Sequence, residues 1–229
     1  MILEICANSY QSAENAQEAG AHRIELCQEL EVGGITPSYG LIKYVIQNLE
    51  IPVFVLIRPR GGNFVYSDTE FNIMKNDIIL CKDLGCHGIV SGVLNSDKTI
   101  DVKRIETLIE LSKPLEFTFH RAFDKVANPK EALEQLIDIG AERVLTSGQH
   151  QTAELGLNLL KELNVIADGR ITILAGGGIS RANASKFRAC GLKEIHASAS
   201  SKFESDTSLF SSPLTFSDPQ RIKAILDAI

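Results

Sequence analysis

The sequence lacks any long apolar run and any leader of the secretory type. No segment approaches the roughly 18 consecutive apolar residues that indicate a membrane span. The first residues, MILEIC, place Glu4 where a signal peptide carries basic residues. These two absences predict a cytoplasmic protein with no membrane partner.

Basic charge is also scarce. The 229 residues include 23 lysines and arginines against 29 aspartates and glutamates, which gives a net charge of −6. Proteins that bind nucleic acids in general need clustered basic charge to displace counterions from the phosphates. We therefore expect no nucleic-acid partner.

Cysteine is present but lacks the arrangements that signal a disulfide framework or a zinc site. There are five cysteines, an odd number, at positions 6, 27, 81, 86 and 190, and no Cys-x-x-Cys spacing occurs. A protein of the cytoplasm keeps its thiols reduced. Free thiols are expected, with metal binding or catalysis more plausible for them than cross-linking.

What the sequence does contain is a repeated pattern at helix ends. Four segments have a helix-like stretch that stops at glycine, followed within a few residues by a short apolar run: EAGAHRIELC, DLGCHGIVSG, DIGAERVLTSG and ACGLKEIHAS. Glycine suits a helix C-cap because it enters the left-handed region without strain, and the run after it is typical of a buried strand. The glycines are Gly20, Gly85, Gly140 and Gly191, so successive repeats are 65, 55 and 51 residues apart. Each interval fits two strand–helix units.

Four further strands are predicted between these repeats, which brings the total to eight. They are LEIC at the start, VFVLI after Pro52, EFTFH after Pro114 and ITILA after Gly169. Helix starts are indicated at Thr36-Pro37, at Ser67 to Glu70, and at Asn128-Pro129 with Glu131. Alternation of strand and helix predicts a parallel sheet, and eight units favour a single (β/α)₈ barrel over an open doubly wound sheet. We expect one domain over 1–229, with a Ser-rich loop at 198–217 and a terminal helix at about 218–229.

Chemistry is expected where the strands end, because barrels of this type carry their sites on the loops that follow the strands. The first two strands end alike, in Glu4-Ile5-Cys6 and Glu25-Leu26-Cys27. Alternation along a strand directs these glutamates and cysteines into the barrel and the apolar residues toward the helices. Two neighbouring thiols could share a soft ion such as Cu(I). The alternative is that Cys6 and Cys27 only fill the barrel. The other three cysteines lie away from this face and are interpreted as packing residues.

Basic and glycine-rich strand ends point to an anion. The third strand ends in Arg58-Pro59-Arg60-Gly61-Gly62, and arginine forks match carboxylates and phosphates. Arg58 could instead neutralise Glu4 or Glu25, because buried carboxylates need partners.

Strand seven ends in Gly176-Gly177-Gly178, and a helix is expected to start near Ser180, an arrangement that holds phosphate in many barrels. His120, at the end of strand five, could move a proton or bind a metal. Asp124 could belong to the site or cap the following helix.

Several of these segments together resemble the CutC family of proteins linked to copper homeostasis. The resemblance rests on EIC, GAHRIELC, GGITPS, IRPRGGNFVYSD, FTFHRAFD, ERVLTSG and AGGGI in this order, and it spans the chain from Ile2 to about Ala199. It implies a TIM-type barrel that assembles as a homodimer or larger homo-oligomer. In the human member of the family a copper-binding role is assigned to two cysteines that match Cys6 and Cys27 here.

Two functions of different classes remain open at this point. The first is Cu(I) binding by Cys6 and Cys27 at the barrel mouth. The second is an enzyme acting on a small phosphorylated or carboxylated metabolite, in which Glu25 and His120 would serve as acid–base groups and Arg58, Arg60, Gly176 and Gly177 would bind the anion. The second is motivated by more polar residues at the strand ends than a copper ion would use.

Overall fold

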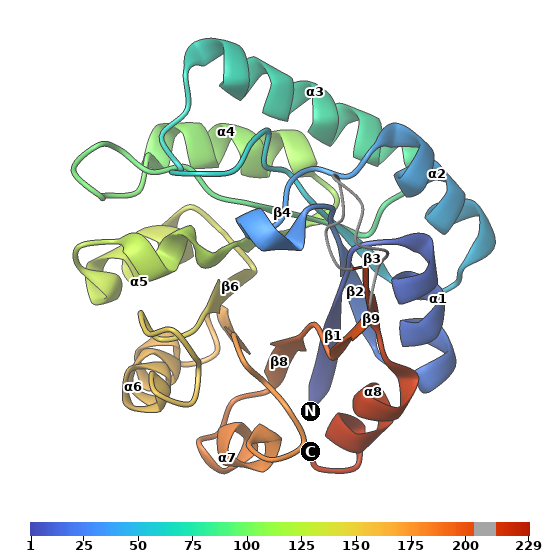
Figure 1. The fold of residues 1–229 in the computed structure, drawn as a ribbon. Helices are drawn as coiled ribbons and strands as arrows, with labels where there is room; N and C mark the ends of the chain where they lie inside the picture. Colours follow the sequence, from blue (N-terminus) through green and yellow to red (C-terminus); the bar gives the residue numbers. More distant parts are fainter. Residues whose placement is uncertain (204–213) are drawn as a thin grey trace.

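Eight parallel strands form a closed barrel in the computed structural model, which describes residues 1–203 and 214–229 (Figure 1). Each strand pairs with the next along the chain, and the eighth pairs with the first. The strands are β1 (Ile2–Ala7), β2 (Arg23–Leu26), β3 (Val53–Leu56), β4 (Gly88–Ser91), β5 (Glu116–Phe119), β6 (Arg143–Thr146), β7 (Thr172–Gly176) and β8 (Glu194–Ala197). The prediction of a (β/α)₈ barrel is confirmed, and closure between β8 and β1 excludes the open sheet.

The helices surround the strands (Figure 1). They are α1 (Tyr10–Ala19), α2 (Tyr39–Asn48), α3 (Asp68–Leu84), α4 (Val102–Ser112), α5 (Pro129–Asp138), α6 (Leu157–Ala167), α7 (Ala184–Ala189) and α8 (Pro219–Leu226), with short 3₁₀ turns η1 (Leu30–Val32) and η2 (Arg121–Lys125). Among the described residues, no helix combines the length and the apolar character needed to cross a bilayer.

The helix ends follow the signals in the sequence. The four repeat glycines all adopt the left-handed conformation, with φ between +79° and +86°. Ser67 caps α3 in a reciprocal capping box with Glu70, and Asn128 caps α5. The start of α2 was expected at Thr36-Pro37 but lies at Tyr39, because Ser38 supplies the side-chain cap.

The segment after β8 differs from the expected loop. Its two ends pair as antiparallel strands β9 (Ser200–Phe203) and β10 (Leu214–Ser217), so the prediction of a loop throughout 198–217 is wrong for these residues. Residues 204–213 lie outside the described part of the chain. The terminal helix was predicted correctly, and Asp218 caps its first turn.

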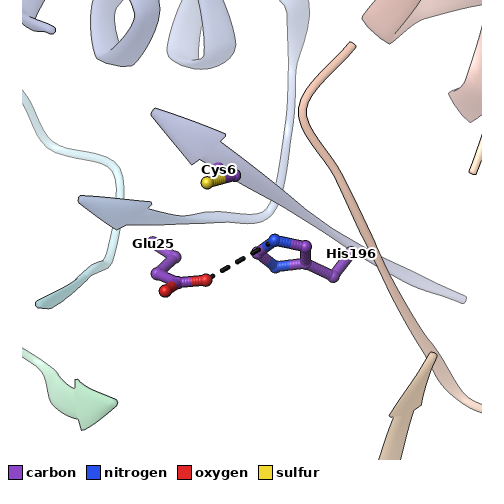
Figure 2. A group of neighbouring side chains, drawn as sticks. All are labelled: Cys6, Glu25 and His196. Carbon is purple, nitrogen blue, oxygen red and sulfur yellow. Dashed lines mark ion pairs between the residues drawn. The ribbon is translucent and has the colours of Figure 1, made fainter. Parts of the chain in front are cut away.

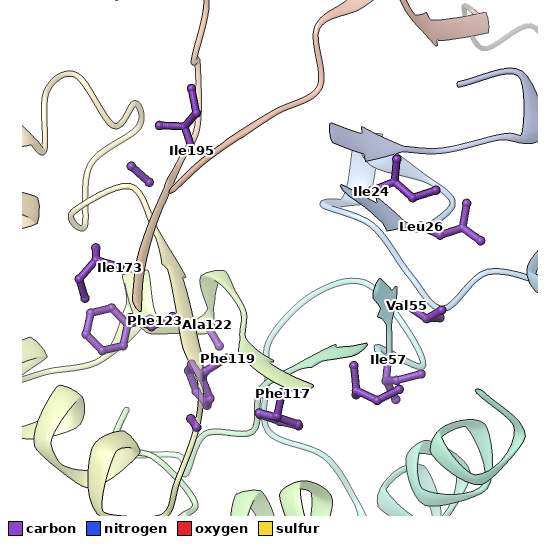
Figure 3. Packing of buried hydrophobic residues seen from close by; sticks show 14 of the residues in the cluster. Ile24, Leu26, Val55, Ile57, Phe117, Phe119, Ala122, Phe123, Ile173 and Ile195 are labelled. Atoms are coloured by element: carbon purple, nitrogen blue, oxygen red, sulfur yellow. The ribbon is translucent and has the colours of Figure 1, made fainter. Parts of the chain in front are cut away.

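Because side chains alternate along the strands, the buried residues form two clusters, one between the strands and the helices and one inside the barrel. Residues such as Ile24, Val55 and Phe117 point outward and pack with the helices into a large apolar core (Figure 3). Their neighbours along the strands point into the barrel, where Cys6, Cys27, Phe54, Leu56 and Val90 form a smaller cluster. The predicted division of β1 and β2 into an apolar outer face and a polar inner face is therefore confirmed.

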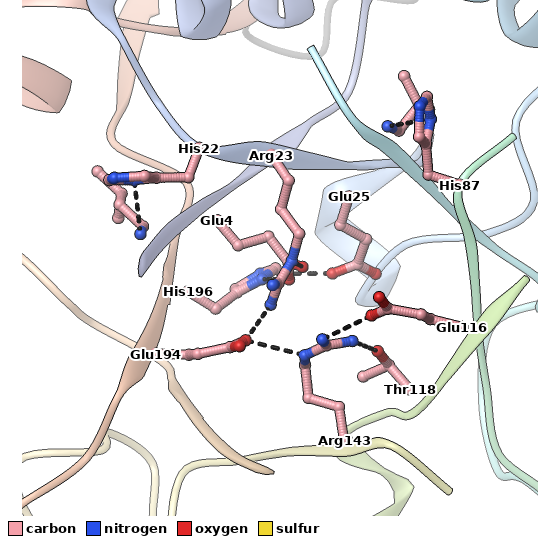
Figure 4. A network of polar contacts seen from close by, with 12 residues as sticks. Glu4, His22, Arg23, Glu25, His87, Glu116, Thr118, Arg143, Glu194 and His196 are labelled. Atoms are coloured by element: carbon pink, nitrogen blue, oxygen red, sulfur yellow. Dashed lines mark hydrogen bonds and ion pairs between the residues drawn. The ribbon is translucent and has the colours of Figure 1, made fainter. Parts of the chain in front are cut away.

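Below that small cluster the barrel is filled by charges that neutralise one another (Figure 4). The guanidinium of Arg23 binds the carboxylates of Glu4 and Glu194, and Arg143 binds Glu194 at 2.8 Å. Both guanidinium groups also lie over the ring of Phe54, at 5.1 and 5.3 Å. Because buried carboxylates are costly without partners, this network ties β1, β2, β6 and β8 together across the interior.

Candidate functional site

A pocket of about 260 Å³ opens at the carboxyl ends of the strands, on the face where chemistry was expected. Its walls come from β1, β2, β3, β6 and β8 and from the loops that follow strands, among them the turn after β5. Of the residues predicted for the site, it is lined by Cys6, Glu25, Cys27, Arg58, His120 and Gly177. Arg60 and Gly176 are not among its lining residues.

The thiols of Cys6 and Cys27 touch inside this pocket, with their Sγ atoms 3.5 Å apart. Cys6 pairs with Glu25 in the register of β1 and β2, so Cys27 lies one inward-facing position further along. The sequence predicts that the two cysteines lie at equivalent heights in the barrel. The structure offsets Cys27 from Cys6 by two residues along the strand, and the two sulfur atoms still make contact. Both side chains are buried, and Cys6 retains 8% exposure.

His196, at the end of β8, completes a cluster of ligand-type side chains (Figure 2). One ligand atom from each of Cys6, Glu25 and His196 lies within 4.8 Å of the other two. The imidazole Nε2 is 3.5 Å from a carboxylate oxygen of Glu25, and Nδ1 is 2.7 Å from an oxygen of Glu4. The cluster therefore offers sulfur, nitrogen and oxygen donors at one place.

Sequence reasoning assigns His196 no role in metal binding. β8 is the farthest of the eight strands from β1 along the chain, and the two become neighbours only when the barrel closes. In the closed barrel His196 pairs in register with Glu4. The available signal was the alternation of Glu194 and His196, which directs both side chains inward once β8 is accepted as the last barrel strand.

Beneath the thiols, the surrounding charges stabilise the ionised forms of Glu4 and His196. Burial opposes ionisation of Glu4, but the charges of Arg23 and His196 prevail and lower the pKa of Glu4 to about 2. Burial likewise opposes a charge on His196. Hydrogen bonds to Cys6 and Glu4 and the charges of the two glutamates nevertheless raise the pKa of His196 well above its usual value.

For Glu25 and Cys6, which both line the pocket, the surroundings favour the uncharged form and raise the pKa. Burial raises the pKa of Glu25 to about 7, although the charge of His196 opposes the shift. The hydrogen bond to Cys27 and then burial raise the pKa of the Cys6 thiol well above its usual value. Without a metal, Cys6 is therefore a thiol at neutral pH.

His120 lines the pocket at the end of β5. Burial and then the charge of Arg58 lower its pKa to about 3, so the imidazole is neutral near pH 7. Its Nδ1 accepts a hydrogen bond from the backbone N–H of Ala122 at 3.2 Å, which leaves the ring proton on Nε2. This state makes His120 a hydrogen-bond donor and a poor proton acceptor, which weakens the acid–base role considered for it.

The two arginines after β3 lie in different places. Arg58 is buried and donates from its terminal nitrogens to the carbonyls of Val32, Gly34 and Gly62, at 2.8–2.9 Å. It does not neutralise Glu4, which instead pairs with Arg23. Arg60 pairs with Glu70 at 2.5 Å and lies over the Tyr66 ring, away from the pocket.

The glycines after β7 line the pocket only in part. Gly177 and Gly178 reach it in left-handed conformations, whereas a Cβ at Gly176 would lie 2.5 Å from Leu145 and 3.2 Å from His196. Gly176 therefore leaves space for His196. The helix expected near Ser180 begins instead at Ala184, after a turn, and has only six residues. The expected helix terminus for a phosphate is thus absent at that position.

Asp124 has a structural role in the loops beside the pocket. Its carboxylate pairs with Arg121 at 2.7 Å and accepts hydrogen bonds from the N–H groups of Ser147 and Gln149. It therefore holds the turn after β6 and does not cap α5, whose cap is Asn128.

Comparison with known proteins identifies the relatives of this barrel. The model of the CutC family matches residues 1–201. The chain belongs to the CutC family. A CutC family protein of Photorhabdus laumondii is 51% identical over 86% of this chain and 79% of its own length. The human protein named copper homeostasis protein cutC homolog is 48% identical over 89% of this chain and 75% of its own.

Solved structures agree with this membership. A CutC crystal structure from Streptococcus agalactiae superposes with a TM-score of 0.82, at 37% identity, and covers 86% of this chain and 98% of its own. An aldolase, QR15, matches with a TM-score of 0.65 at 17% identity, which shows only that the barrel fold is shared. The resemblance seen in the sequence is thus confirmed as CutC family membership.

Two segments that carried the CutC resemblance meet at the pocket. IRPRGG supplies Arg58, and FTFHRAFD supplies His120 and Arg121. The family match ends at residue 201, just after β9 begins, so β10 and α8 lie beyond it. The part of this chain that matches the family therefore contains every pocket residue.

Proposed function

We propose that this CutC family protein binds Cu(I) through the sulfur atoms of Cys6 and Cys27, with His196 as a third donor. The observation that carries the proposal is the 3.5 Å contact between the two thiols beside an imidazole. Thiolates are the ligands that Cu(I) prefers. The relatives named copper homeostasis proteins support copper as the ion.

The separation of the sulfurs fits a shared ion. Metal–thiolate bonds are roughly 2.3 Å long in zinc sites, so two such bonds span more than the 3.5 Å between the Sγ atoms. The sulfur–ion–sulfur angle of an ion bonded to both sulfurs would therefore be bent and not linear. A bent arrangement leaves one side of the ion open to a third donor. Glu25 is a hard oxygen ligand and is the least suited of the cluster to Cu(I).

Binding must release protons. Cys6 is protonated at neutral pH in the absence of metal, and a ligating sulfur is a thiolate. The affinity for Cu(I) is therefore expected to weaken as the pH falls. His196 would also have to give up a proton before Nε2 could bind.

The test is an anaerobic titration of the reduced protein with Cu(I), in competition with a chelator of known affinity. We expect one ion per chain in the unaltered protein and loss of tight binding in a Cys6→Ser, Cys27→Ser double variant. His196→Asn should weaken binding without abolishing it. Equal binding by the unaltered protein and the double variant, or no binding by either, would contradict the proposal.

The chain offers a matched control in a second pair of buried thiols. Cys81 and Cys86 are both buried free thiols at the other end of the barrel, where Cys86 precedes β4. No ligand-type histidine or carboxylate cluster of the described residues includes them. A Cys81→Ser, Cys86→Ser variant should therefore keep the affinity of the unaltered protein.

The catalytic alternative has weaker support. The low pKa of His120 disfavours that imidazole as a proton acceptor, and Arg60 lies outside the pocket. Of the residues named for this alternative, Glu25 remains as an acid–base group, with a pKa of about 7, and Arg58 and Gly177 remain at the pocket for an anion. Homo-oligomeric assembly and a cytoplasmic location stay predictions.

A further inference from the structure

Two buried nitrogen atoms beside the pocket have no hydrogen-bond partner within the described residues. They are Nε of Arg58 and Nε2 of His120, and each is almost completely inaccessible. Both side chains line the pocket. Buried polar groups are nearly always paired, so an unpaired one at a pocket indicates a group that arrives with a ligand.

Both nitrogens are donors. The proton of the neutral His120 ring is on Nε2, because Nδ1 accepts from the Ala122 backbone. The terminal nitrogens of Arg58 are already occupied by three backbone carbonyls, which fix the guanidinium and leave the Nε–H without an acceptor at hydrogen-bond distance among the described residues. The buried Tyr66 hydroxyl, which also has no hydrogen bond there, interacts electrostatically with this guanidinium. Neither nitrogen can ligate a metal in this state, so these two groups are not explained by copper.

The two donors lie on one wall of the pocket, beside the same aromatic ring. The centroid of the Phe64 ring is 4.9 Å from that of His120, and the Arg58 guanidinium carbon is 5.0 Å from it. The Arg58 charge also contributes to keeping His120 neutral. We call Arg58, Phe64 and His120 the donor wall.

A ligand for the donor wall must supply acceptors and negative charge. Arg58 carries a positive charge that none of the described carboxylates pairs with, since its guanidinium donates only to backbone carbonyls among the described residues. A carboxylate has two oxygens, one for each donor. The pocket volume of about 260 Å³ is at the small end for ligand sites, which favours a molecule of a few carbon atoms.

A phosphate ester is the less suitable oxyanion. The glycine turn after β7 is followed by a six-residue helix that begins only at Ala184, so no long helix adds its N-terminal N–H groups there. Arg121, which also lines the pocket, is already paired with Asp124 at 2.7 Å. One unpaired positive charge matches a monoanionic group better than a dianion.

We propose that Arg58 and His120 bind the carboxylate of a small organic acid in this pocket, as a site separate from the thiol pair. The proposal does not depend on copper, because neither donor is a metal ligand. The remainder of the acid would lie toward Cys6 and Glu25, which line the same pocket.

The experiment is calorimetric titration of the metal-free, reduced protein with acetate, lactate, pyruvate and malonate. Acetamide and lactamide serve as uncharged controls, and glycerol phosphate tests the other oxyanion. We expect saturable binding of at least one carboxylate and none of its amide. His120→Leu and Arg58→Met should each weaken binding by about tenfold or more, because each removes a hydrogen bond to a charged group.

Arg60→Met is the matched control, since it makes the same substitution two residues away and outside the pocket. It should leave the affinity unchanged. Because Arg58 also fixes loop carbonyls, Arg58→Met could fail to fold. Nitrogen-detected NMR of the unaltered protein then supplies a second readout, in which the carboxylate should shift the His120 Nε2 resonance.

Three results would overturn the proposal. They are absence of carboxylate binding by the unaltered protein, unchanged affinity in folded His120→Leu, and binding of glycerol phosphate in preference to every carboxylate. A failure of copper binding would leave it untouched, because the titration is made without metal.

Discussion

His120 is held neutral by its surroundings, and this has a consequence for stability. Burial and the Arg58 charge lower its folded-state pKa to about 3 from 6.5. The unfolded chain therefore takes up a proton below about pH 6.5 that the folded chain refuses until about pH 3. The contribution of the neutral His120 to the free energy of unfolding is fully present above about pH 6.5. It is lost progressively as the pH falls from about 6.5 toward 3.

The expected loss attributable to His120 is about 2 kcal/mol between pH 7.5 and pH 5. Denaturant unfolding at both pH values, in the unaltered protein and in His120→Asn, measures it. The variant should lose less stability than the unaltered protein over the same interval, because asparagine does not titrate. An equal loss in both proteins would show that His120 protonates normally in the folded state.

Side chains of the candidate site could be predicted from the sequence where local alternation decides their direction. Cys6 and Cys27 follow from the two Glu-x-Cys strand ends, and they meet. His196 could not be assigned because its position beside Glu4 depends on closure between the first and last strands. Arg60 could not be separated from Arg58 because loop geometry after β3 decides which of them turns inward.

At the scale of single elements, two glycines form a matched pair, one at a helix C-cap and one inside a helix. Gly85 ends α3 with φ +82°, and Gly40 lies in the first turn of α2 with a φ outside the left-handed range. An added Cβ would meet nothing within 4 Å at either position. Any difference between alanine variants therefore comes from the backbone.

Gly85→Ala should lower the free energy of unfolding by about 1 kcal/mol, because alanine is strained in the left-handed region. Gly40→Ala should raise it by about 0.5 kcal/mol, because alanine favours the helix and restricts the unfolded chain. Denaturant unfolding of the two variants measures both effects. Changes of the same sign would refute the assignment of Gly85 as a left-handed cap.

The elements themselves were largely predictable because their boundaries depend on nearby residues. Capping residues marked both ends of α3 and α5 and the C-terminal ends of α1 and α7, and short apolar runs marked the eight strands. β9 and β10 escaped prediction because they pair only with each other, across a long Ser-rich segment without strong alternation. α7 was misplaced because Asn183, not Ser180, precedes its first residue.

For the whole molecule, closure of the barrel depends on charges that cross the β1–β8 seam. Arg23 on β2 binds Glu4 on β1 and Glu194 on β8, and its side chain is 6% exposed. Arg23→Met would remove a cation shared by two buried carboxylates. Glu4 would keep His196 and Glu194 would keep Arg143, so we expect a loss of about 3 kcal/mol, toward the lower end for a broken buried pair.

In thermal unfolding this loss corresponds to a fall in the midpoint of about 10 °C for a chain of this size. Arg170→Met is the control, because Arg170 also makes two bonds to one carboxylate, that of Glu134 at 2.7 and 2.8 Å, but both side chains are 45% exposed. Water screens such a pair, so its removal should change the midpoint little. If Arg23→Met changed stability no more than Arg170→Met, the interior charges would not hold the barrel closed, and the apolar layer between strands and helices would suffice.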